Sequence, residues 1–541
     1  MSTDHTQSPQ TPNNDQSSGS KNFITRFLDT VEFLGNLLPH PVILFAILCA
    51  LVIVISGVAG YFELAVLDPR PEGSRGRSPS GMIEVVSLFN IEGLQQILTQ
   101  LVKNFTGFTP LGTVLVALLG VGIAERSGVI SAAMRNLVMG APKKLVTFAV
   151  VLAGIVSNTA AELGYVVLIP LSAMIFASLG RHPLAGLAAA FAGVSGGYSA
   201  NLLIGTVDPL LSGISEKAAQ LIDPSYTVGA EANWYFMMAS TVVISILGML
   251  ITEYIVEPQL GLYNKDDASP EHVEELEQEM NSHAVTDIER KGLRVVGIYT
   301  LIFAGVLAST IVPENGILRH PETGLVAGSP FLKSILAFIF IYFALAGLVY
   351  GKVVKSITNS TDVVHAMNHA MNTMGAYIVL VFFAAQFVAF FKWTNLGAIL
   401  AVLGAQTLES LGLTGPILFF FFIGVCGLIN LSLGSASAQW AVTAPIFIPM
   451  LMLVGYSPEV IQAAYRIGDS TTNIITPMMS YFGLILAVAE KYKKDLGIGT
   501  LISMMLPYSV VFITAWSLFF YFWVFIMGFP VGPGAPIYYT M

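Results

Sequence analysis

Charged residues are scarce in this sequence, because Asp, Glu, Lys and Arg together make up only 11% of its 541 residues. A soluble protein of average composition carries roughly 25%, so this scarcity excludes an ordinary soluble domain. The apolar residues come in blocks of about 20, the length with which a helix crosses roughly 30 Å of hydrocarbon. The composition therefore predicts an all-α polytopic protein of the lipid bilayer. The formal net charge of -9 says little about partners, and we expect no nucleic acid among them.

Cysteine is almost absent as well, with two residues, Cys49 and Cys426. Both lie in apolar stretches, which argues against a disulfide framework or a metal cluster and predicts two inert buried thiols. The N-terminus lacks the apolar core of a signal peptide and is rich in Ser, Thr, Gln, Asn and Pro. We therefore expect residues 1–22 to be a disordered cytoplasmic tail and residues 23–541 to form a single transmembrane domain without an organic cofactor.

Apolar stretches between charged or Pro/Gly-rich segments predict nine full crossings. Two further apolar stretches, about 143–178 and 415–454, are too long for one helix. Small polar residues interrupt each stretch in its middle. Since each half is only about 14 to 20 residues long, we expect two re-entrant hairpins. The nine crossings cover approximately 41–63, 110–124, 184–206, 234–256, 295–312, 330–350, 373–391, 459–488 and 499–528.

The basic residues predict the orientation of these crossings. With both hairpins re-entrant, 16 of the 25 Lys and Arg fall on one side, 8 fall on the other and Arg466 stays within the membrane. The positive-inside rule places the more basic side in the cytoplasm. We therefore expect a cytoplasmic N-terminus, a cytoplasmic loop over residues 261–292 and a periplasmic C-terminus.

An offset of 275 residues aligns the two interrupted stretches, and the crossings that follow them, without gaps. The matches include Pro183 with Pro458 and the small polar residues that break the helices. Five crossings separate the copies, and this odd number gives repeat 1 (about 143–210) and repeat 2 (about 415–488) inverted topology. Inverted repeats with discontinuous helices are typical of secondary transporters, whose binding sites lie near the membrane midplane.

Repeat 1 contributes two groups of polar residues to such a site. Ser157, Asn158 and Thr159 interrupt the first hairpin, where the ends of half-helices could face an anion; a plain polar turn at the membrane surface is the alternative. In the next crossing a Gly-Gly pair at 196–197 can unwind the helix. Asp208 follows it, and could equally be an ordinary carboxylate at a helix end.

Repeat 2 contributes Asn430, Ser437 and Trp440 at the second hairpin tip. Trp440 aligns with Tyr165 of repeat 1, so each tip is followed by one aromatic side chain that could stack on a ring. A tryptophan in a membrane protein is otherwise an interfacial anchor.

The stretch "YRIGDSTTNIITP" carries Arg466 and Asp469 inside a predicted crossing. We expect its polar run to break the crossing helix of repeat 2, as the Gly-Gly pair does in repeat 1. Charges within a membrane are costly and mark functional sites by default. The two residues share one helical face and could simply pair. The oxygens of Asp469 and of the hydroxyls after it suit a sodium ion, and a carboxylate that binds and releases a proton would serve proton coupling equally well.

At "SNTAAELGYVVLIPLSAMIF", "GSASAQWAVTAPIFIPMLML" and "AAYRIGDSTTNIITPMMSYFGLI" the sequence resembles the p-aminobenzoyl-glutamate transporter (AbgT) family. The resemblance covers nearly the whole chain from about Phe27. It implies a homodimer of nine-helix protomers with two opposed hairpins in the bacterial inner membrane. The members it resembles most export p-aminobenzoate and sulfonamide drugs. The family's functional positions fall on Asp208, Asn430, Ser437, Trp440, Pro458, Arg466, Asp469 and Pro477, and Asn430 with Asp469 is where the resemblance places a sodium ion.

We therefore expect an ion-coupled secondary active transporter of folate-related aromatic carboxylates, with p-aminobenzoyl-glutamate, p-aminobenzoate and sulfonamides as candidate substrates. In this hypothesis Arg466 meets the substrate carboxylate, Trp440 meets its ring, and Asp469 with Asn430 holds the coupling cation. A passive channel and a sodium-coupled dicarboxylate importer are the alternatives. An intramembrane hydrolase is disfavoured, because Asp469 has no second aspartate in a matching span and no His lies in a core span; we expect no enzyme. The motifs decide neither the direction of transport nor the coupling ion.

Overall fold

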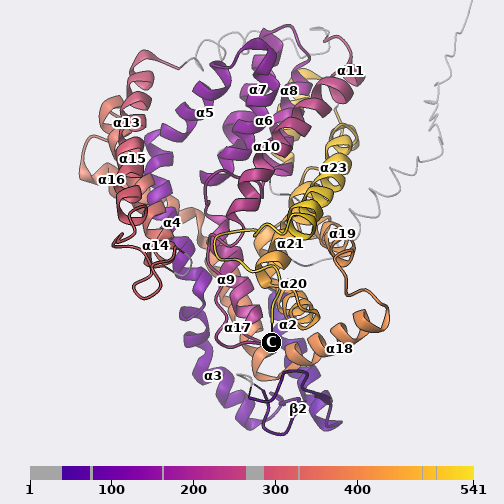
Figure 1. Cartoon of the computed structure of the whole chain (residues 1–541). Coiled ribbons are helices and arrows are strands. Elements are labelled where there is room, and N and C mark those ends of the chain that lie inside the picture. The colour runs from indigo at the N-terminus through magenta and orange to yellow at the C-terminus, as the bar shows by residue number, and fades with distance from the viewer. Residues whose placement is uncertain are drawn as a thin grey trace, which may run out of the picture.

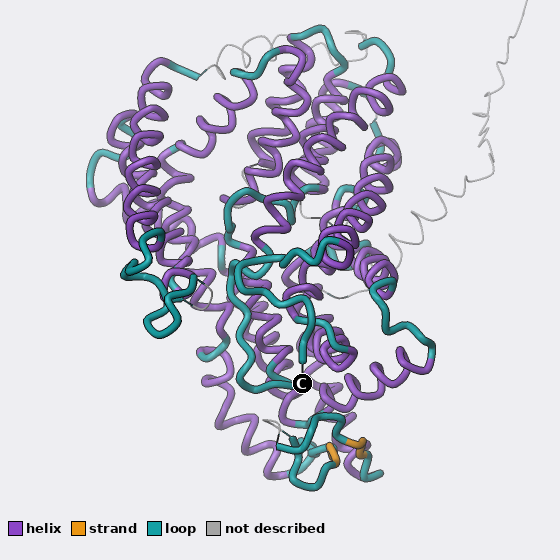
Figure 2. Tube along the Cα trace, in the orientation of Figure 1, coloured by secondary structure: helices purple, strands orange, loops and turns teal. Residues whose placement is uncertain are grey.

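The computed structural model of the chain describes residues 39, 41–73, 77–160, 164–263, 285–326, 329–477, 479, 481–494 and 496–540. Helices dominate these residues (Figures 1 and 2), and eight of the helices, or nine if one bent pair is counted as a span, are long and apolar enough to cross a membrane. The predicted all-α polytopic fold is confirmed. The predicted N-terminal tail and most of the loop over 261–292 lie outside the described residues.

Long helices form the body of the molecule. They are α2 (Pro41–Tyr61), α3 (Ile91–Thr106), α4 (Thr109–Ser127), α10 (Trp234–Ile251), α13 (Asp287–Ile311), α15 (Ile335–Val354), α17 (Gly375–Trp393), α18 (Leu396–Ser410), α20 (Ala436–Val454), α21 (Pro458–Asn473) and α23 (Ile498–Tyr521). Shorter helices are α5 (Val129–Met139), α6 (Val146–Ser157), α7 (Ile169–Ser178), α8 (Pro183–Phe191), α9 (Val207–Ala219), α11 (Glu257–Leu260), α14 (Pro330–Lys333), α16 (Ser360–Thr373), α19 (Leu418–Asn430) and α22 (Phe482–Tyr492). Single turns of tighter or wider helix are η1 (Lys143–Leu145), η2 (Asn158–Ala160), η3 (Gly164–Leu168), η4 (Ala192–Gly196), η5 (Thr252–Val256) and η7 (Phe522–Ile526). Strands β1 (Ala65–Leu67) and β2 (Met82–Glu84) pair antiparallel.

The outer helices expose their apolar side chains. Only 17% of the most apolar window of α2 is buried, and only 6% of that of α13. Large apolar side chains such as Ile43, Leu51 and Leu301 are therefore exposed on these helices, as expected for surfaces that face lipid. Helices α13, α15 and α16 lie together on one side of Figure 1 beside α4, on which α15 and α16 pack.

Both interrupted stretches form hairpins. Hairpin 1 runs from α6 through η2 into η3 and α7, and hairpin 2 joins α19 to α20 through residues 431–435. Hairpin 1 lies in the upper half of Figure 1 and α20 in the lower half. Each hairpin packs on the helix that follows it, since α7 contacts α8 and α19 contacts α21. This arrangement agrees with the predicted opposed hairpins.

One glycine in each crossing helix allows its close contact with a hairpin. A Cβ atom on Gly193 would lie 2.5 Å from the backbone oxygen of Val151 in α6, and a Cβ on Gly468 would lie 2.5 Å from that of Ile423 in α19. Gly193 and Gly468 are also related by the 275-residue offset. The two repeats therefore share one packing rule, in which a small residue lets two helix backbones touch.

The structure adds one helix that was not predicted and corrects two predicted crossings. Amphipathic α3 precedes α4 and was not predicted, because its polar residues dilute its hydropathy. The crossing at 184–206 ends at Gly196, after which the chain turns and continues into α9. The crossing at 459–488 is broken after Asn473, so residues 465–473 are regular helix rather than the break that we expected.

The residues that the repeat alignment pairs explain why the helix of repeat 1 ends at Gly196, whereas α21 of repeat 2 continues to Asn473. Repeat 1 has Gly196 and Gly197 where repeat 2 has Thr471 and Thr472. The two Thr hydroxyls donate to the carbonyl oxygens of Ile467 and Gly468 one turn earlier, at 2.7 and 2.8 Å. Threonine satisfies its hydroxyl within the helix in this way, whereas two glycines weaken helical structure.

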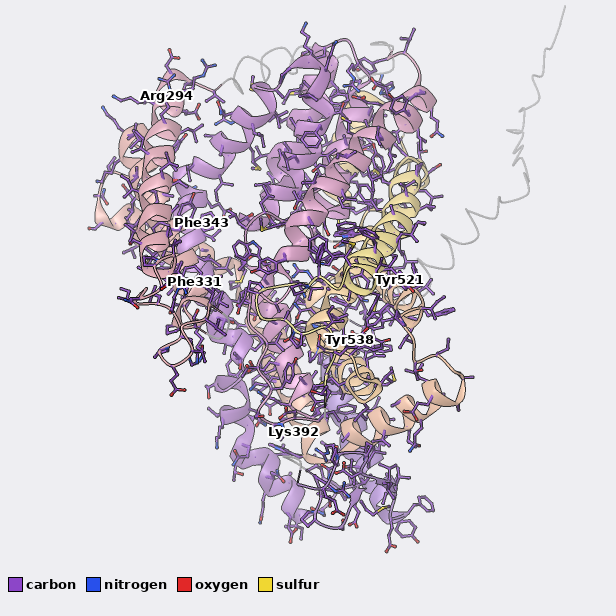
Figure 3. The ribbon with its side chains drawn as sticks, in the orientation of Figure 1. Arg294, Phe331, Phe343, Lys392, Tyr521 and Tyr538 are labelled. Atoms are coloured by element: carbon purple, nitrogen blue, oxygen red, sulfur yellow. The ribbon has the colours of Figure 1, made fainter. Side chains whose placement is uncertain are left out.

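The C-terminal segment returns to the turn between α20 and α21. The Ser457 N–H donates to the carbonyl of Ile537 at 3.2 Å, and the Tyr539 N–H donates to the carbonyl of Gly455 at 2.9 Å. The Ser457 hydroxyl donates to the carbonyl of Pro536 at 2.5 Å. Figure 3 labels Tyr538 in this segment, which forms an isolated antiparallel bridge with Tyr456.

Candidate functional site

A cavity of about 460 Å³ lies between the two hairpin tips and helices α4, α9 and α16. Asn158 and Tyr165 line it from hairpin 1, and residues 434–437 line it from hairpin 2. Its other lining residues are Val114, Leu118, Gly122, Glu125, Val166, Tyr198, Thr206, Val207, Leu210, Ala370, Met374, Tyr377, Asn473, Met479 and Tyr481. Both inverted repeats therefore contribute to one cavity, as the sequence predicted.

The tip of hairpin 2 presents the start of a helix to this cavity. Ser435 is the N-cap of α20, and its hydroxyl accepts the N–H of Ala438 at 3.5 Å. Ser437 follows in the first turn, where backbone N–H groups have no partner within the helix. Helix N-termini with such free N–H groups bind carboxylates and other anions.

The three polar residues predicted at the tip of hairpin 1 separate in the structure. The side-chain amide of Asn158 donates to the carbonyl of Val194 at 2.9 Å, and Asn158 lines the cavity. Ser157 and Thr159 line a second cavity of about 350 Å³ between α5, α6, α13 and α15, which is mostly apolar. Only Asn158 of the three therefore belongs to the shared cavity.

Two aromatic pairs lie near the tips, and only one of them faces the cavity. Tyr165 stacks on Tyr481 with ring centroids 4.6 Å apart and planes 5° apart, and both rings line the cavity. Trp440 stacks on Tyr465 at 4.1 Å, has no exposed surface and is absent from the lining. In this conformation Trp440 therefore lies outside the lining of the shared cavity, and its contact with a substrate ring stays a prediction.

The charged residues of α21 do not pair with each other. Nη1 of Arg466 lies 2.6 Å from Oδ1 of Asp208, and the two side chains are 4% and 3% exposed. Asp208 sits in the first turn of α9, where the helix dipole favours an acid, and its Oδ2 accepts the N–H of Gly205 at 2.6 Å. The possible Arg466 to Asp469 ion pair is thus replaced by one that links α21 to α9. Asp208 is a buried ion-pair partner, not an ordinary carboxylate at a helix end.

Asp469 is buried with neither of its carboxylate oxygens hydrogen-bonded within the described part of the chain. The same holds for Oδ1 of Asn430, whose amide nitrogen contacts the carbonyl of Asp469 and the side chains of Thr472 and Asn473 at 2.8 to 2.9 Å. A buried carboxylate without a partner is very costly. These oxygens therefore fit a bound cation or a proton.

Comparison with known proteins decides the family. The family model of the AbgT transporters matches residues 26–539. The chain belongs to the AbgT family. It is therefore a multi-pass membrane transporter, from a family of transporters rather than of enzymes.

Individual AbgT relatives match over nearly the full chain. The p-aminobenzoyl-glutamate transport protein of Escherichia coli strain K12 is 38% identical over 504 residues, which cover 93% of this chain and 95% of that protein. A solved structure of Neisseria gonorrhoeae MtrF, described as illuminating a class of antimetabolite efflux pumps, is 64% identical with a TM-score of 0.88, and the match covers 94% of this chain and 100% of that one. The Alcanivorax borkumensis YdaH transporter, described as having an unusual topology, is 43% identical with a TM-score of 0.83, and the match covers 92% and 100%.

Trp440 of this AbgT protein begins a chain of hydrogen bonds that all point one way. Its indole N–H donates to the Ser215 hydroxyl at 2.9 Å, which donates to Oε1 of Gln462 at 2.6 Å. Nε2 of Gln462 donates to Oδ1 of Asn233, and Nδ2 of Asn233 donates to the carbonyl of Glu459, both at 2.8 Å. An indole N–H can only donate, so Trp440 fixes which group is the donor in each of the hydrogen bonds that follow.

This series of hydrogen bonds joins hairpin 2 to α9, to α21 and to the residue before α10. Sequence analysis missed Ser215, Gln462 and Asn233. Gln462 could have indicated these contacts, because it is a large polar side chain in a predicted crossing. Such a side chain is costly to bury without a hydrogen-bond partner.

The two predicted prolines lie at the ends of α21 rather than in the cavity lining. Pro458 is the first residue of α21, after the N-cap Ser457, whose side chain accepts the N–H of Val460. A proline fits this position because its missing N–H would have no partner there. Pro477 lies in the break between α21 and α22. Pro458 therefore marks the start of α21, and Pro477 follows the last residue of α21 by four positions.

Proposed function

We propose that this AbgT protein is an ion-coupled secondary active transporter of folate-related aromatic carboxylates. Its substrates would be p-aminobenzoate, p-aminobenzoyl-glutamate and the sulfonamide antimetabolites, and export of the last would give drug resistance by antiport. The observation that carries the proposal is a cavity shared by two inverted hairpin tips, with a buried unpartnered carboxylate at Asp469 in the helix next to it. The named function of the E. coli relative supports the substrate class, and the description of MtrF supports the outward direction.

The cavity has the size and chemistry for such a substrate. Its volume of about 460 Å³ falls within the roughly 300 to 1,000 Å³ of small-molecule sites. The Tyr165 and Tyr481 rings offer an aromatic wall, while Ser437 and the first turn of α20 offer N–H and hydroxyl donors to an acidic group. Asn158 would donate or accept from the opposite hairpin.

The three buried oxygens of Asp469 and Asn430 without a hydrogen-bond partner favour sodium as the coupling ion. A sodium ion would use both oxygens of Asp469 and Oδ1 of Asn430, which are hard ligands. A proton would neutralise Asp469 but occupy only one of these oxygens. We therefore propose sodium, and keep proton coupling as the alternative for the test below.

Arg466 takes a different role from the one expected from the sequence. Its contact with Asp208 joins the charged helix of repeat 2 to α9, so we propose that this pair holds the two elements in register during transport. Trp440, Pro458 and Pro477 would likewise hold hairpin 2 and α21 in place. Ser157 and Thr159 would shape hairpin 1, without contacting the substrate.

We also propose a homodimer in the bacterial inner membrane with a cytoplasmic N-terminus and a periplasmic C-terminus. The distribution of Lys and Arg supports the orientation. The family resemblance supports the dimer, and the largely exposed apolar surface of α13 leaves room for a partner or for lipid.

Reconstitution into proteoliposomes tests the proposal. We expect p-aminobenzoate to accumulate against its gradient when an opposing sodium gradient is imposed. Accumulation with a proton gradient alone would show that protons, and not sodium ions, are the coupling ions. Equilibration without accumulation would indicate a passive channel, and transport of succinate instead of p-aminobenzoate would indicate a dicarboxylate carrier.

The Asp469→Asn variant tests the coupling site. The substitution removes the charge while keeping the shape, so we expect coupled transport to fall at least about tenfold, which corresponds to about 1.4 kcal/mol. Asp287→Asn, at an exposed position in the first turn of α13, is the matched control. Sodium-driven transport by Asp469→Asn at the parent rate would remove Asp469 from the site.

A further inference from the structure

The second cavity, of about 350 Å³ between α5, α6, α13 and α15, differs in chemistry from the shared cavity. Among the described residues that line it there is no Asp, Glu, Lys, Arg or His. Apolar side chains such as Met134, Leu293 and Phe343 form most of its wall. A folate-related acid finds no charged partner there, so the second cavity suits an occupant of a different chemical class.

The hydroxyl groups in the lining of the second cavity already have partners within the protein. They belong to Ser157, Thr159, Thr300 and Tyr342. The first two donate to other described groups at 2.6 and 3.0 Å. The Thr300 hydroxyl donates to a carbonyl one turn earlier on α13 at 2.9 Å, and the Tyr342 hydroxyl lies 3.1 Å from it. Because these protons are used, the wall of the cavity presents apolar surface to its occupant.

Helix α13 places the second cavity at a surface that faces lipid. Four lining residues of α13 recur at the spacing of one helical face, and they are Leu293, Val296, Gly297 and Thr300. Only 6% of the most apolar window of this helix is buried. Gly297 and Leu203, which also lines the cavity, are themselves exposed. The cavity therefore opens toward hydrocarbon, and an acyl chain is the apolar ligand that a bilayer supplies.

Basic side chains lie at one end of the same stripe of α13. Arg290 and Arg294 are exposed, and each precedes a lining residue, Leu293 or Gly297, by three positions, so each lies beside the stripe. Both come directly before the apolar part of α13, the level at which membrane helices meet lipid head groups. Figure 3 labels Arg294 near the upper end of α13, and Phe343 of the cavity lining below it. The two charges are therefore placed to meet the phosphate of a lipid whose chain fills the cavity.

We propose that the second cavity binds one acyl chain of an anionic phospholipid, whose phosphate contacts Arg290 and Arg294. Basic residues beside a pocket between transmembrane helices recognise anionic head groups in this way. The chain contacts Ser157 and Thr159, whereas Asn158 between them lines the shared cavity. The tip of hairpin 1 therefore touches both the lipid and the shared cavity. This site goes beyond the proposed function and does not depend on which substrate is transported.

Two kinds of variant separate the chain from the head group. A Cβ on Gly297 meets nothing within 4 Å, so Gly297→Leu fills part of the cavity without a clash. Gly305→Leu is its matched control, because Gly305 is also exposed and open on α13 but is not a lining residue. The double variant Arg290→Gln with Arg294→Gln removes the two charges. Lys291→Gln is the control for charge, since helical spacing places Lys291 on the other face of α13.

Native mass spectrometry of the purified full-length protein measures the binding of phosphatidylglycerol and of phosphatidylcholine with identical chains. We expect the parent and both controls to prefer phosphatidylglycerol by about 10- to 30-fold, since each basic residue contributes about fivefold. The double variant should lose this preference and bind phosphatidylcholine as the parent does. Gly297→Leu should weaken the tightest site for both lipids at least about tenfold, because an excluded chain loses two or more buried CH₂ groups.

Thermal unfolding of each variant establishes that it is folded. Parent-like binding of both lipids by Gly297→Leu would overturn the second cavity as the site. A parent without a preference, or a double variant that keeps it, would overturn the role of Arg290 and Arg294. Unchanged lipid binding by Gly297→Leu with an altered oligomeric state would assign the cavity to a second copy of the chain. Unchanged lipid binding with a raised KM for p-aminobenzoate would assign it to the substrate.

Discussion

The two crossing helices that follow the hairpins share a packing frame and differ in chemistry. Gly193 and Gly468 occupy equivalent positions and allow the same backbone contact with α6 and α19. Around them, repeat 1 carries Phe191 and Val194 where repeat 2 carries Arg466 and Asp469. Of these two crossing helices, that of repeat 1 therefore contributes shape and an unwound turn, and that of repeat 2 contributes buried charges.

The equivalent aromatic residues diverge in the same way. Tyr165 lines the shared cavity, whereas its counterpart Trp440 is fully buried and donates its indole N–H to Ser215. The two repeats thus share the positions at which their helices touch. Their equivalent side chains differ in position and in the groups that they contact. An asymmetric site for an asymmetric substrate can arise from a symmetric scaffold.

Removal of Asp208, the partner of Arg466, is expected to have the largest effect, because this buried ion pair joins the crossing helix of repeat 2 to α9. Asp208→Ala leaves the guanidinium buried without a countercharge, and breaking such a pair costs about 3 to 5 kcal/mol. We expect a large fall in the thermal unfolding temperature in detergent. The double variant Asp208→Ala with Arg466→Met should recover much of it; no recovery would show that the pair is not the cause.

Addition of a methyl group at the shared glycines tests the common frame. Gly193→Ala and Gly468→Ala each force a Cβ against a backbone oxygen that cannot move independently, and overpacking of this kind costs about 1 to 3 kcal/mol. The two losses should be similar. Gly424→Ala on α19, where a Cβ meets nothing within 4 Å, is the control and should remain within about 0.5 kcal/mol of the parent.

The series of hydrogen bonds that begins at Trp440 of repeat 2 predicts a smaller effect. Ser215→Ala removes the acceptor of the indole N–H and the donor to Gln462, and an unsatisfied buried group costs about 1 to 3 kcal/mol. Trp440→Phe combined with Ser215→Ala should cost less than the sum of the single variants, because the two residues share one bond. Additive losses in thermal unfolding would show that the chain is not coupled.

An ion pair outside the membrane-spanning helices gives the smallest predicted effect. Asp68 and Arg70 lie between α2 and β2 with side-chain atoms 2.6 Å apart. Burial raises the pKa of Asp68, but hydrogen bonds from the Arg70 side chain and from the Ser78 and Arg70 backbone outweigh it, so the pKa is lowered.

The sign of the pH dependence follows from this lowered pKa. Asp68 contributes full stability above its unfolded pKa of about 3.9, and the contribution is lost as the pH falls through the folded value. Thermal unfolding between pH 7 and pH 3 should therefore show a decline for the parent that is shallower for Asp68→Asn. Identical slopes would contradict the assignment.

The sequence was sufficient for the features that depend on composition and periodicity. Apolar length predicted the crossings, and internal similarity predicted the paired hairpins, since both signals are local or lie at one fixed offset. Amphipathic α3 was missed because its hydropathy is diluted. The continuity of α21 was missed because a polar run looks like a break, while Thr471 and Thr472 bond within the helix.

The side-chain partners of the site could be predicted only in part. Asn158, Ser437, Asn430 and Asp469 were identified as candidates from their polarity in apolar surroundings. The partner of Arg466 lies 258 residues away, and no helical spacing reports such a contact. Trp440 likewise contacts Tyr465 of α21 and Ser215 of α9, which a linear pattern does not bring together.

The contact between the C-terminal segment and the turn of residues 455–457 has a consequence for biosynthesis. A ribosome completes repeat 1 more than 300 residues before it makes residues 536–539, which hydrogen-bond to this turn. The turn before α21 therefore lacks these hydrogen bonds until residues 536–539 have been made. During that interval α21, with its buried Arg466 and Asp469, depends on its other contacts, such as the ion pair between Arg466 and Asp208.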